Sequence, residues 1–272
     1  MNGVTSAGQV RPPAVAGRFY PAQAEALEAE VGCLLTEAET ASVAFPKAVI
    51  APHAGYLFSG PIAGTAFSTW TNSGRRVERV VLIGPSHYLS FPGICVSSAH
   101  AFGVPRGPVT VARDAVDLLT RHGLTRVNDA AHAPEHALEV ELPFLQAQLL
   151  DFQIIPLLVG QTAGEQVAEV LNAVWGGDET VVVVSSDLSH YLDYAHARQV
   201  DGETRVAIEE LNPEPIDEAH ACGSKVIQGL LLVAKHRQLD VSTLDLRNSG
   251  DTAGPRDQVV GYGAWAFTCT ST

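Results

Sequence analysis

Short runs of β-branched residues alternate with helix-length amphipathic stretches along most of this chain of 272 residues. The runs that predict strands are residues 47–51, 77–83, 93–97, 153–159, 180–185 and 259–267. The stretches that predict helices are residues 22–38, 61–69, 112–122, 136–150, 163–175, 195–211 and 222–237. Continuously apolar runs are typical of strands that helices cover on both faces. The alternation therefore predicts an α/β fold, a single layered domain with a mostly parallel sheet flanked by helices.

No linker-like segment or internal repeat interrupts this alternation. We expect residues 1–10 to be a loosely ordered N-terminus and residues 11–272 to form a single α/β domain. No run approaches the roughly 18 apolar residues that a membrane span needs, and the first residues lack the pattern of a secretory signal. The four cysteines form no closely spaced pair, which favours a reducing, cytoplasmic location.

Acidic residues outnumber basic ones by 30 to 17, so the formal net charge is −13. This charge argues against nucleic acid or an anionic membrane as a partner. The sequence contains no GxSxG, P-loop, GxGxxG or HExxH motif, which argues against acyl hydrolases, nucleotide-dependent enzymes and zincins.

Three histidines follow the ends of predicted strands. His53 and His87 come shortly after the first two strands, and Asp187 and His190 follow the strongly apolar run 180–185. A single histidine after a strand is most often a loop residue that caps a backbone group. Ligands of open α/β sheets bind outside the carboxyl ends of strands, so the repetition favours one convergent site.

Two further positions have both a functional and a structural interpretation. His136 and Glu139 lie three residues apart, so on a helix the carboxylate could orient the imidazole. Alternatively, Glu135 and Glu139 are first-turn acids that complement the helix dipole. Cys222 opens the last long helix, where a lowered pKa would make it a thiolate ligand or nucleophile. The alternative for Cys222 is a small buried apolar side chain.

Seven motifs, in this order, resemble those of the Memo family, whose prokaryotic branch is often labelled component B of the AmmeMemoRadiSam system. They are residues 11–21 (RPPAVAGRFYP), 52–60 (PHAGYLFSG), 84–87 (GPSH), 135–139 with 142–145 (EHALE, LPFL), 185–191 (SSDLSHY), 222–223 (CG) and 248–251 (NSGD). The resemblance extends from about residue 11 to 267, which is nearly the whole chain.

The resemblance implies a fold similar to class III extradiol dioxygenases, which are non-haem Fe(II) enzymes with two histidine ligands and one glutamate ligand. By motif, His53 and His87 match the histidine ligands, and Cys222 stands at the glutamate position. His190 matches the acid/base histidine, and Asp187 belongs to the same pocket motif. The other positions assigned to the pocket or to the groups behind the ligands are Tyr56, Tyr88, His136, Glu139 and Glu141.

The chain departs from the usual family pattern at three places. Tyr88 follows His87 where members commonly have a second histidine, and Gly261 stands where a serine is frequent. Ser224 and Lys225 follow residues 222–223, and no proline comes shortly after. Because the three expected ligands are kept, these departures concern the substrate pocket more than the metal.

The expected cofactor is Fe(II) or Cu(I). A thiolate in place of a carboxylate is softer and favours Cu(I), Zn or a differently tuned iron, and it is itself oxidisable. One hypothesis is a dioxygenase-like, metal-dependent oxidoreductase that uses His190 on a small-molecule substrate. The other is a non-catalytic copper- or iron-binding protein, or a partner subunit that acts with radical-SAM and other AmmeMemoRadiSam proteins.

Three geometric predictions follow for the site. His53, His87 and His190 should lie near the same edge of the sheet. One of Asp187, Glu139 or Glu141 should face the site and orient an imidazole. If Cys222 is a ligand, its sulfur should lie within about 4–5 Å of the His53 and His87 nitrogens.

Overall fold

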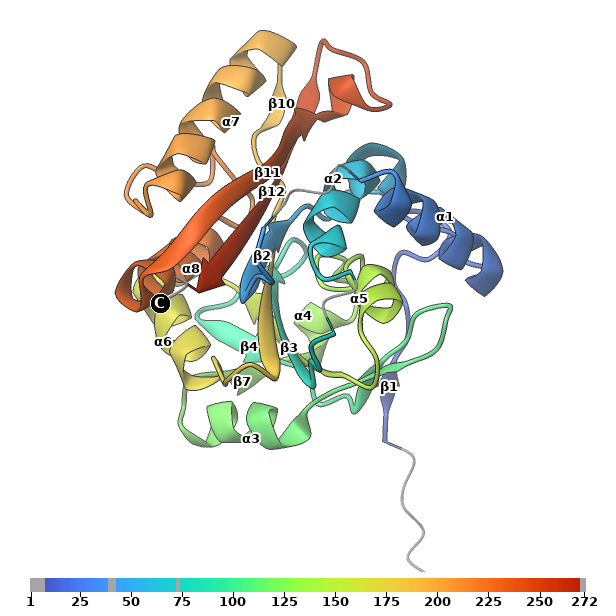
Figure 1. Ribbon diagram of the computed structural model, residues 1–272. Helices are drawn as coiled ribbons and strands as arrows, with labels where there is room; N and C mark the ends of the chain where they lie inside the picture. The colour runs from blue at the N-terminus through green and yellow to red at the C-terminus, as the bar shows by residue number, and fades with distance from the viewer. Residues whose placement is uncertain (1–7, 39–42, 72–73, 270–272) are drawn as a thin grey trace, which may run out of the picture.

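The computed structural model describes residues 8–38, 43–71 and 74–269, and helices cover both faces of a central sheet (Figure 1). The predicted α/β fold is therefore confirmed. Residues 1–7, most of the segment expected to be loosely ordered, lie outside the described residues. Near the start of the described residues, Val10 and Arg11 form the short strand β1 and pair in parallel with β5 (Ala101–Phe102). No helix in the described ranges is both long and apolar enough to cross a membrane.

The central sheet has nine strands within the described residues, in the order β10-β12-β2-β9-β3-β8-β4-β7, and β11 also pairs with β12. Strands β2, β9, β3 and β8 are parallel, whereas β12 and β4 flank this group in antiparallel orientation. The strands of this sheet are β2 (Ala48–Ala51), β3 (Arg79–Pro85), β4 (Ile94–Val96), β7 (Arg126–Val127), β8 (Gln153–Val159), β9 (Thr180–Ser185), β10 (His190–Leu192), β11 (Leu239–Asn248) and β12 (Val259–Cys269). A separate small sheet contains β1 (Val10–Arg11), β5 (Ala101–Phe102) and β6 (Val109–Thr110).

The helices form two groups around this sheet. Helices α1, α2 and α5 pack together on one face, while α6 and α8 pack together on the other, and α7 lies against β11 and β12 (Figure 1). Their bounds are α1 (Ala24–Thr36), α2 (Tyr56–Ser68), α3 (Arg113–Arg121), α4 (Asp129–His132), α5 (Leu142–Gln148), α6 (Gly164–Ala173), α7 (Tyr194–Glu209) and α8 (Ser224–Arg237), and a single 3₁₀ turn covers Ser249–Asp251.

Two predicted helix boundaries are wrong. The helix predicted over 61–69 already begins at Tyr56, because the chain continues as helix through Pro61. The helix predicted over 136–150 begins only at Leu142, with Pro143 in its first turn, where a missing N–H costs no helical hydrogen bond. Residues 137–141 form turns instead.

The parallel centre of the sheet determines where polar side chains can meet. Strand β9 is buried along its whole length, with Val182, Val183 and Val184 fully inaccessible. Its neighbours β2 and β3 run in the same direction, and Ala51 of β2 lies opposite Ser185 of β9. The segments that follow β2, β3 and β9 consequently leave the sheet at one edge.

Candidate metal centre

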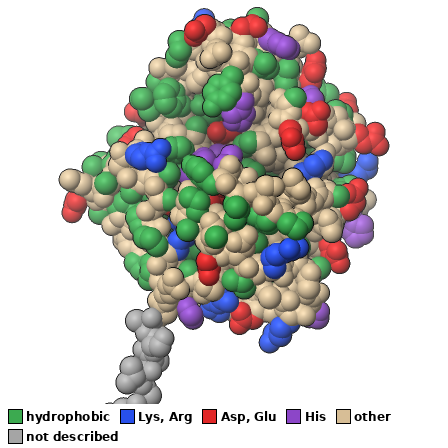
Figure 2. All heavy atoms as spheres, turned by 180° about the vertical axis from the view of Figure 1, so that it is seen from behind, with side chains coloured by type: hydrophobic (Ala, Val, Ile, Leu, Met, Phe, Trp, Pro, Cys, Tyr) green, Lys and Arg blue, Asp and Glu red, His purple; other side chains and the backbone are tan. Residues whose placement is uncertain are grey.

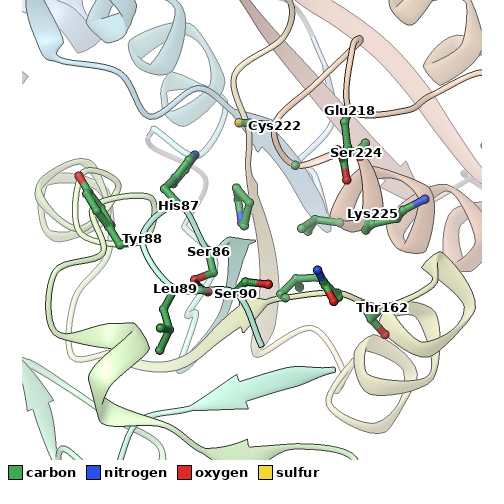
Figure 3. Close-up of a pocket in the computed structure, with 16 residues that line it drawn as sticks. Ser86, His87, Tyr88, Leu89, Ser90, Thr162, Glu218, Cys222, Ser224 and Lys225 are labelled. Atoms are coloured by element: carbon green, nitrogen blue, oxygen red, sulfur yellow. Dashed lines mark hydrogen bonds between the residues drawn. The ribbon is translucent and has the colours of Figure 1, made fainter. Parts of the chain in front are cut away.

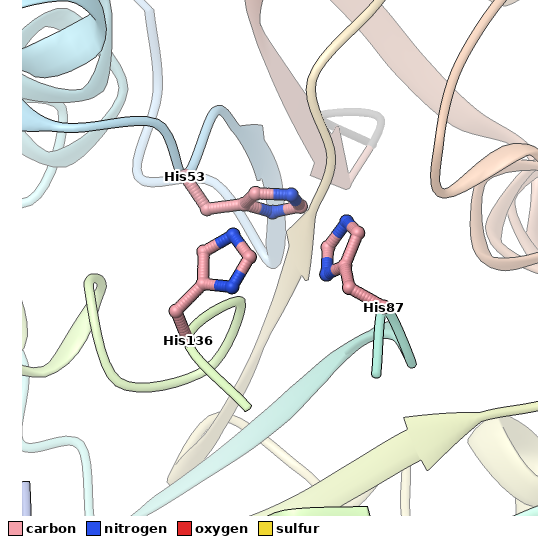
Figure 4. Close-up of side chains that lie close together, drawn as sticks. All are labelled: His53, His87 and His136. Carbon is pink, nitrogen blue, oxygen red and sulfur yellow. The ribbon is translucent and has the colours of Figure 1, made fainter. Parts of the chain in front are cut away.

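Three imidazoles converge at this edge of the sheet (Figure 4). The ring centroids of His53 and His87 lie 5.0 Å apart, and those of His136 lie 5.4 Å from His53 and 4.6 Å from His87. One ligand nitrogen from each ring falls within 4.8 Å of the others, a spacing that could hold one metal ion. His53 and His87 belong to the expected ligand set, whereas the sequence prediction assigned His136 only to the surrounding pocket.

His53 is the buried histidine of this cluster, and its Nδ1 atom forms a hydrogen bond. Ser185 Oγ donates to the Ala137 carbonyl at 2.6 Å and must therefore accept the 2.7 Å hydrogen bond from His53 Nδ1. This arrangement assigns the ring proton to Nδ1 and leaves the Nε2 lone pair directed at the site. Burial, together with the charge of His87, lowers the pKa of His53 well below its usual value, so the ring is neutral at pH 7.

His87 is held by a carboxylate that the sequence prediction did not assign to it. Glu135 Oε1 lies 2.9 Å from His87 Nδ1, and Glu135 Oε2 accepts from the His87 backbone N–H at 2.6 Å. The hydrogen bonds and charge of His87 bring the pKa of Glu135 down to about 2, overcoming the opposing effect of burial. Glu135 is therefore ionised, accepts the Nδ1 proton and leaves Nε2 of His87 free.

One of Asp187, Glu139 and Glu141 was expected to face the site and orient an imidazole. Asp187 does lie at the site, where it bonds the His53 backbone N–H, but the ring nitrogens of His53 and His87 are bonded by Ser185 and Glu135 instead. Residues 137–141 form turns rather than a helix, so the three-residue spacing of His136 and Glu139 does not place them on one helical face. Glu139 points away from the cluster and forms an ion pair with Arg11 at 2.7 Å. It also accepts from the Val15 N–H and from the Tyr20 hydroxyl. Glu139 thus attaches the N-terminal segment to the loop that carries His136.

Glu141 is a buried carboxyl group beside the site. Neither of its oxygens has a hydrogen-bond partner among the described residues. Burial raises its pKa well above the usual value; the nearby Ser185 hydroxyl opposes this shift, and the charge of Asp187 adds to it. Burial therefore favours the neutral form of Glu141 in the surroundings of Ser185 and His53.

Asp187 connects the two expected ligands that lie deepest. Its Oδ1 accepts from the His53 backbone N–H at 2.8 Å, and its own carbonyl accepts from the Cys222 N–H at 3.3 Å. Cys222 Sγ lies 3.4 Å from His53 Nε2, which agrees with the His53 part of the prediction. The group of ligand atoms that lie within 4.8 Å of one another contains His53, His87 and His136 and does not include Cys222.

Gly223 allows α8 to approach the end of β9 at this point. A Cβ at Gly223 would lie 2.7 Å from both the Cβ and the Oγ of Ser186, and the Gly223 N–H donates to that Oγ at 2.9 Å. Any side chain at this position would push the start of α8 away from β9. The glycine therefore contributes to the placement of Cys222.

The expectation of a lowered pKa at Cys222 is wrong for the metal-free protein. Burial, reinforced by the charge of Asp187, raises the pKa of this thiol to about 12. The position before α8 favours the thiolate, but loss of hydration has the larger effect. A metal ion would supply the positive charge that the metal-free site lacks.

His190 lies close to this cluster without joining it. It follows Asp187 by three residues, and its charge contributes to the lowered pKa of His53. His190 Nδ1 lies 2.7 Å from the Leu188 carbonyl, so Nδ1 carries the proton and Nε2 is a free acceptor. Burial lowers the pKa of His136, which packs against His53 and His87, to about 4, and His136 is therefore a neutral imidazole at pH 7.

The remaining expected pocket residues lie in two different environments. Tyr56 packs in the core, where its hydroxyl donates to the Val140 carbonyl at 2.7 Å. Tyr88 is 53% exposed, and its hydroxyl lies 3.3 Å from His136 Nδ1. Tyr88, His87 and Cys222 all line a cavity of about 840 Å³ (Figure 3). On the back face of the molecule, histidine side chains lie at the bottom of a hollow (Figure 2).

The departures from the family pattern can now be placed. Lys225 and Tyr88 both line this cavity. Gly261 lies elsewhere, against α7, where a Cβ would be 2.1 Å from Asp201 Oδ2. Asp201 in turn accepts from the Ser189 N–H at 3.0 Å, next to His190. Gly261 therefore makes room for a carboxylate that supports the His190 segment.

Fold and site together define a mixed α/β protein with a histidine cluster that could bind a metal ion. Comparison with known proteins makes the assignment more specific, since the Memo family, described as Memo-like protein, matches residues 11–266. A MEMO1 family protein of Aquifex aeolicus is 33% identical over 270 residues, which cover 93% of this chain and 97% of the relative. A MEMO1 family protein of Archaeoglobus fulgidus is 34% identical over 269 residues, which cover 95% and 99%. The chain belongs to the Memo family.

Proposed function

We propose that this protein binds a redox-active transition metal, Fe(II) or Cu(I), through His53, His87 and Cys222, with His136 beside them. The observation that carries the proposal is the fixed orientation of the two rings. Ser185 and Glu135 occupy the Nδ1 atoms of His53 and His87, so both Nε2 atoms are free to coordinate. Metal-binding histidines in proteins are held in this way by carboxylates, hydroxyls or carbonyls behind them.

The donor set limits which metal fits. Two imidazoles and a carboxylate suit Fe(II), whereas a thiolate at the third position is a softer donor that also accepts Cu(I). The distance of 3.4 Å between Cys222 Sγ and His53 Nε2 is compatible with both atoms binding one ion. These residues therefore fit either metal, and the relative affinities of the site for Fe(II) and Cu(I) determine which of them it binds.

We propose further that the protein is a metal-dependent oxidoreductase acting on a small molecule. The metal would supply the redox chemistry, and the cavity of about 840 Å³ beside His87 and Cys222 would hold the substrate. His190 would accept or return a substrate proton through Nε2, because its Nδ1 is engaged with the Leu188 carbonyl. Asp187 would hold the His53 backbone in place through the 2.8 Å bond of its carboxylate.

The second candidate is a non-catalytic metal-binding protein, which could act beside a radical-SAM protein. The observation that favours it is the thiol of Cys222 beside His53 Nε2. A thiolate at a centre that activates oxygen is exposed to oxidation, whereas a protein that only holds a soft metal avoids this damage.

Anaerobic titration calorimetry with Fe(II) and with Cu(I) tests metal binding. Cys222→Ser should lower Cu(I) affinity by more than the roughly 10–100-fold that loss of a group behind a ligand costs. Cys33→Ser is the matched control, because Cys33 is an exposed thiol of α1, and it should bind as the wild type does. Equal affinities in wild type and Cys222→Ser would exclude the thiol as a ligand.

Oxygen consumption then separates the two candidates. The Fe(II)-loaded protein would be given a panel of catechols, and His190→Gln would be compared with the wild type. Oxygen uptake with ring cleavage that falls in His190→Gln supports the oxidoreductase. Tight metal binding with no uptake on any member of the panel favours the non-catalytic protein.

A further inference from the structure

The cavity beside the candidate metal centre extends from the metal site to the first turn of α8. Its lining includes His87 and Cys222 at one end and Ser224, Lys225 and Val226 of α8 at the other. Figure 3 draws the Lys225 ammonium on the side away from His87 and Cys222. A ligand in this cavity would therefore meet both the metal site and the start of a helix.

The start of α8 has no internal cap. Gly223 is the residue before the helix and offers no side chain to accept from the first N–H groups. The N–H groups of Lys225 and Val226 have no acceptor among the described residues. Free N–H groups and the positive end of the helix dipole favour an anion at such a position.

Ser224 supplies an independent indication of a ligand. The residue is only 1% exposed and lines the cavity, yet its hydroxyl has no hydrogen-bond partner in the described part of the chain. Buried hydroxyls are nearly always hydrogen-bonded, so a free one facing a cavity marks a place for a ligand group.

Two charged side chains complete this end of the cavity. The Lys225 ammonium contacts only the Gln228 side-chain oxygen, at 3.3 Å, and has no ion-pair partner in the described ranges. Glu218 also lines the cavity but is exposed to solvent. The ammonium and the positive end of the helix favour an anionic ligand group here, and the exposed Glu218 at the rim disfavours one of high charge.

We propose that this cavity binds a small organic carboxylate, with the carboxylate seated on the N–H groups of Lys225 and Val226, the Ser224 hydroxyl and the Lys225 ammonium. The opposite end of this ligand would point to the metal, and this part of the proposal rests on the proposed function. Lys225 follows Cys222 by three residues, so their Cα atoms are at most about 10 Å apart. The ligand is accordingly a short molecule that spans the distance between these two ends of the cavity.

The first test needs no metal. Metal-free, isotope-labelled protein would be titrated with benzoate, with neutral benzyl alcohol and with inorganic phosphate, and the backbone amide resonances would be followed. Benzoate should shift the amides of Ser224, Lys225 and Val226 and bind about tenfold more tightly than benzyl alcohol. Equal binding of the two, or no shift at these amides, would overturn the proposal. Tighter binding of phosphate than of benzoate would show that the carboxylate assignment is wrong.

Variants of α8 make the test specific. Lys225→Met should weaken benzoate binding several-fold, and Ser224→Ala should weaken it to a smaller extent. Lys235→Met removes an exposed lysine at the far end of the same helix and should bind benzoate like the wild type. If Lys225→Met and Ser224→Ala both keep wild-type affinity, the anion does not bind at this helix start and the proposal fails.

The metal part is measured separately. The affinity of Zn(II)-loaded protein for 3,4-dihydroxybenzoate should exceed its affinity for benzoate, because the hydroxyl groups then reach the metal. Metal uptake without any effect of benzoate on α8 would overturn the anion site alone. An effect of benzoate without metal uptake would overturn the proposed function and leave the anion site standing.

Discussion

The inner and outer sides of the candidate metal centre differ in how firmly their side chains are held. On the inner side, His53 and Asp187 are buried, and His53 is bonded through both its ring and its backbone. On the outer side, Glu135 holds the His87 ring, but the His87 side chain is 27% exposed, and the Tyr88 hydroxyl lies 3.3 Å from His136 Nδ1. The buried side chains, together with Glu135 behind His87, therefore determine the geometry in which a metal would be bound. The outer side is open and is the part that can vary with the substrate.

Glu139→Gln should have the largest effect, because it breaks the buried ion pair that holds the loop carrying His136. The Arg11–Glu139 pair is buried, and removing one charge leaves Arg11 uncompensated. Breaking a buried pair in this way costs about 3–5 kcal/mol of unfolding free energy. Urea denaturation would measure the loss. Glu169→Gln, at an exposed position of α6, is the control and should change stability by no more than about 0.5 kcal/mol. A similar value for Glu139→Gln would show that this pair does not hold the loop that carries His136.

The pH dependence of stability should show the next effect, through Glu135. Its pKa is about 2 in the folded protein, against 4.5 for the free side chain. Because the folded value is lower, the unfolded chain binds more protons, and the stabilisation is complete above about pH 4.5 and lost as the pH falls towards 2. The loss should be on the order of 3 kcal/mol. The difference between wild-type and Glu135→Gln stability should shrink over this range, and a constant difference would contradict the assignment.

The same comparison explains which parts of the fold were predictable from the sequence. The buried strands β2, β3, β8 and β9 appear as continuous apolar runs, because both of their faces are covered. Strand β11 (Leu239–Asn248) was missed, since it alternates apolar and polar residues and follows a helix after a single residue. Its alternation is typical of a half-buried strand and could have identified it.

The candidate site was predictable to a similar degree. His53 and His87 were found because each follows a buried strand, and the resemblance supplied Cys222. The partner of His87 was not found, because Glu135 and Glu139 both fit a first helical turn on paper. Which of them faces the site depends on the ion pair of Glu139 with Arg11, which lies 128 residues away along the chain. A local pattern carries no information on such a contact.

Ser185→Ala should reduce metal affinity without a comparable loss of folding. The substitution leaves His53 Nδ1 without its acceptor and releases the ring from its present orientation. Loss of a group behind a metal ligand costs about 10–100-fold in affinity. Calorimetric metal titration of Ser185→Ala measures the loss. The control is Ser90→Ala, which removes an exposed hydroxyl that lines the cavity. If both variants bind the metal equally well, the inner side is not the more important one for its geometry.

Tyr88→Phe, a substitution on the outer side, should have the smallest effect on stability and on metal affinity. The Tyr88 hydroxyl is solvent-accessible and lies at a long distance from His136 Nδ1, so its loss should change stability by less than about 0.5 kcal/mol. Metal affinity should also stay within about twofold, because Tyr88 contacts neither Nδ1 of His53 nor that of His87. Substrate affinity is the quantity that this residue can alter, since it lines the cavity. A tenfold loss of metal affinity in Tyr88→Phe would show that the outer side also determines the metal geometry, and the distinction between the two sides would fail.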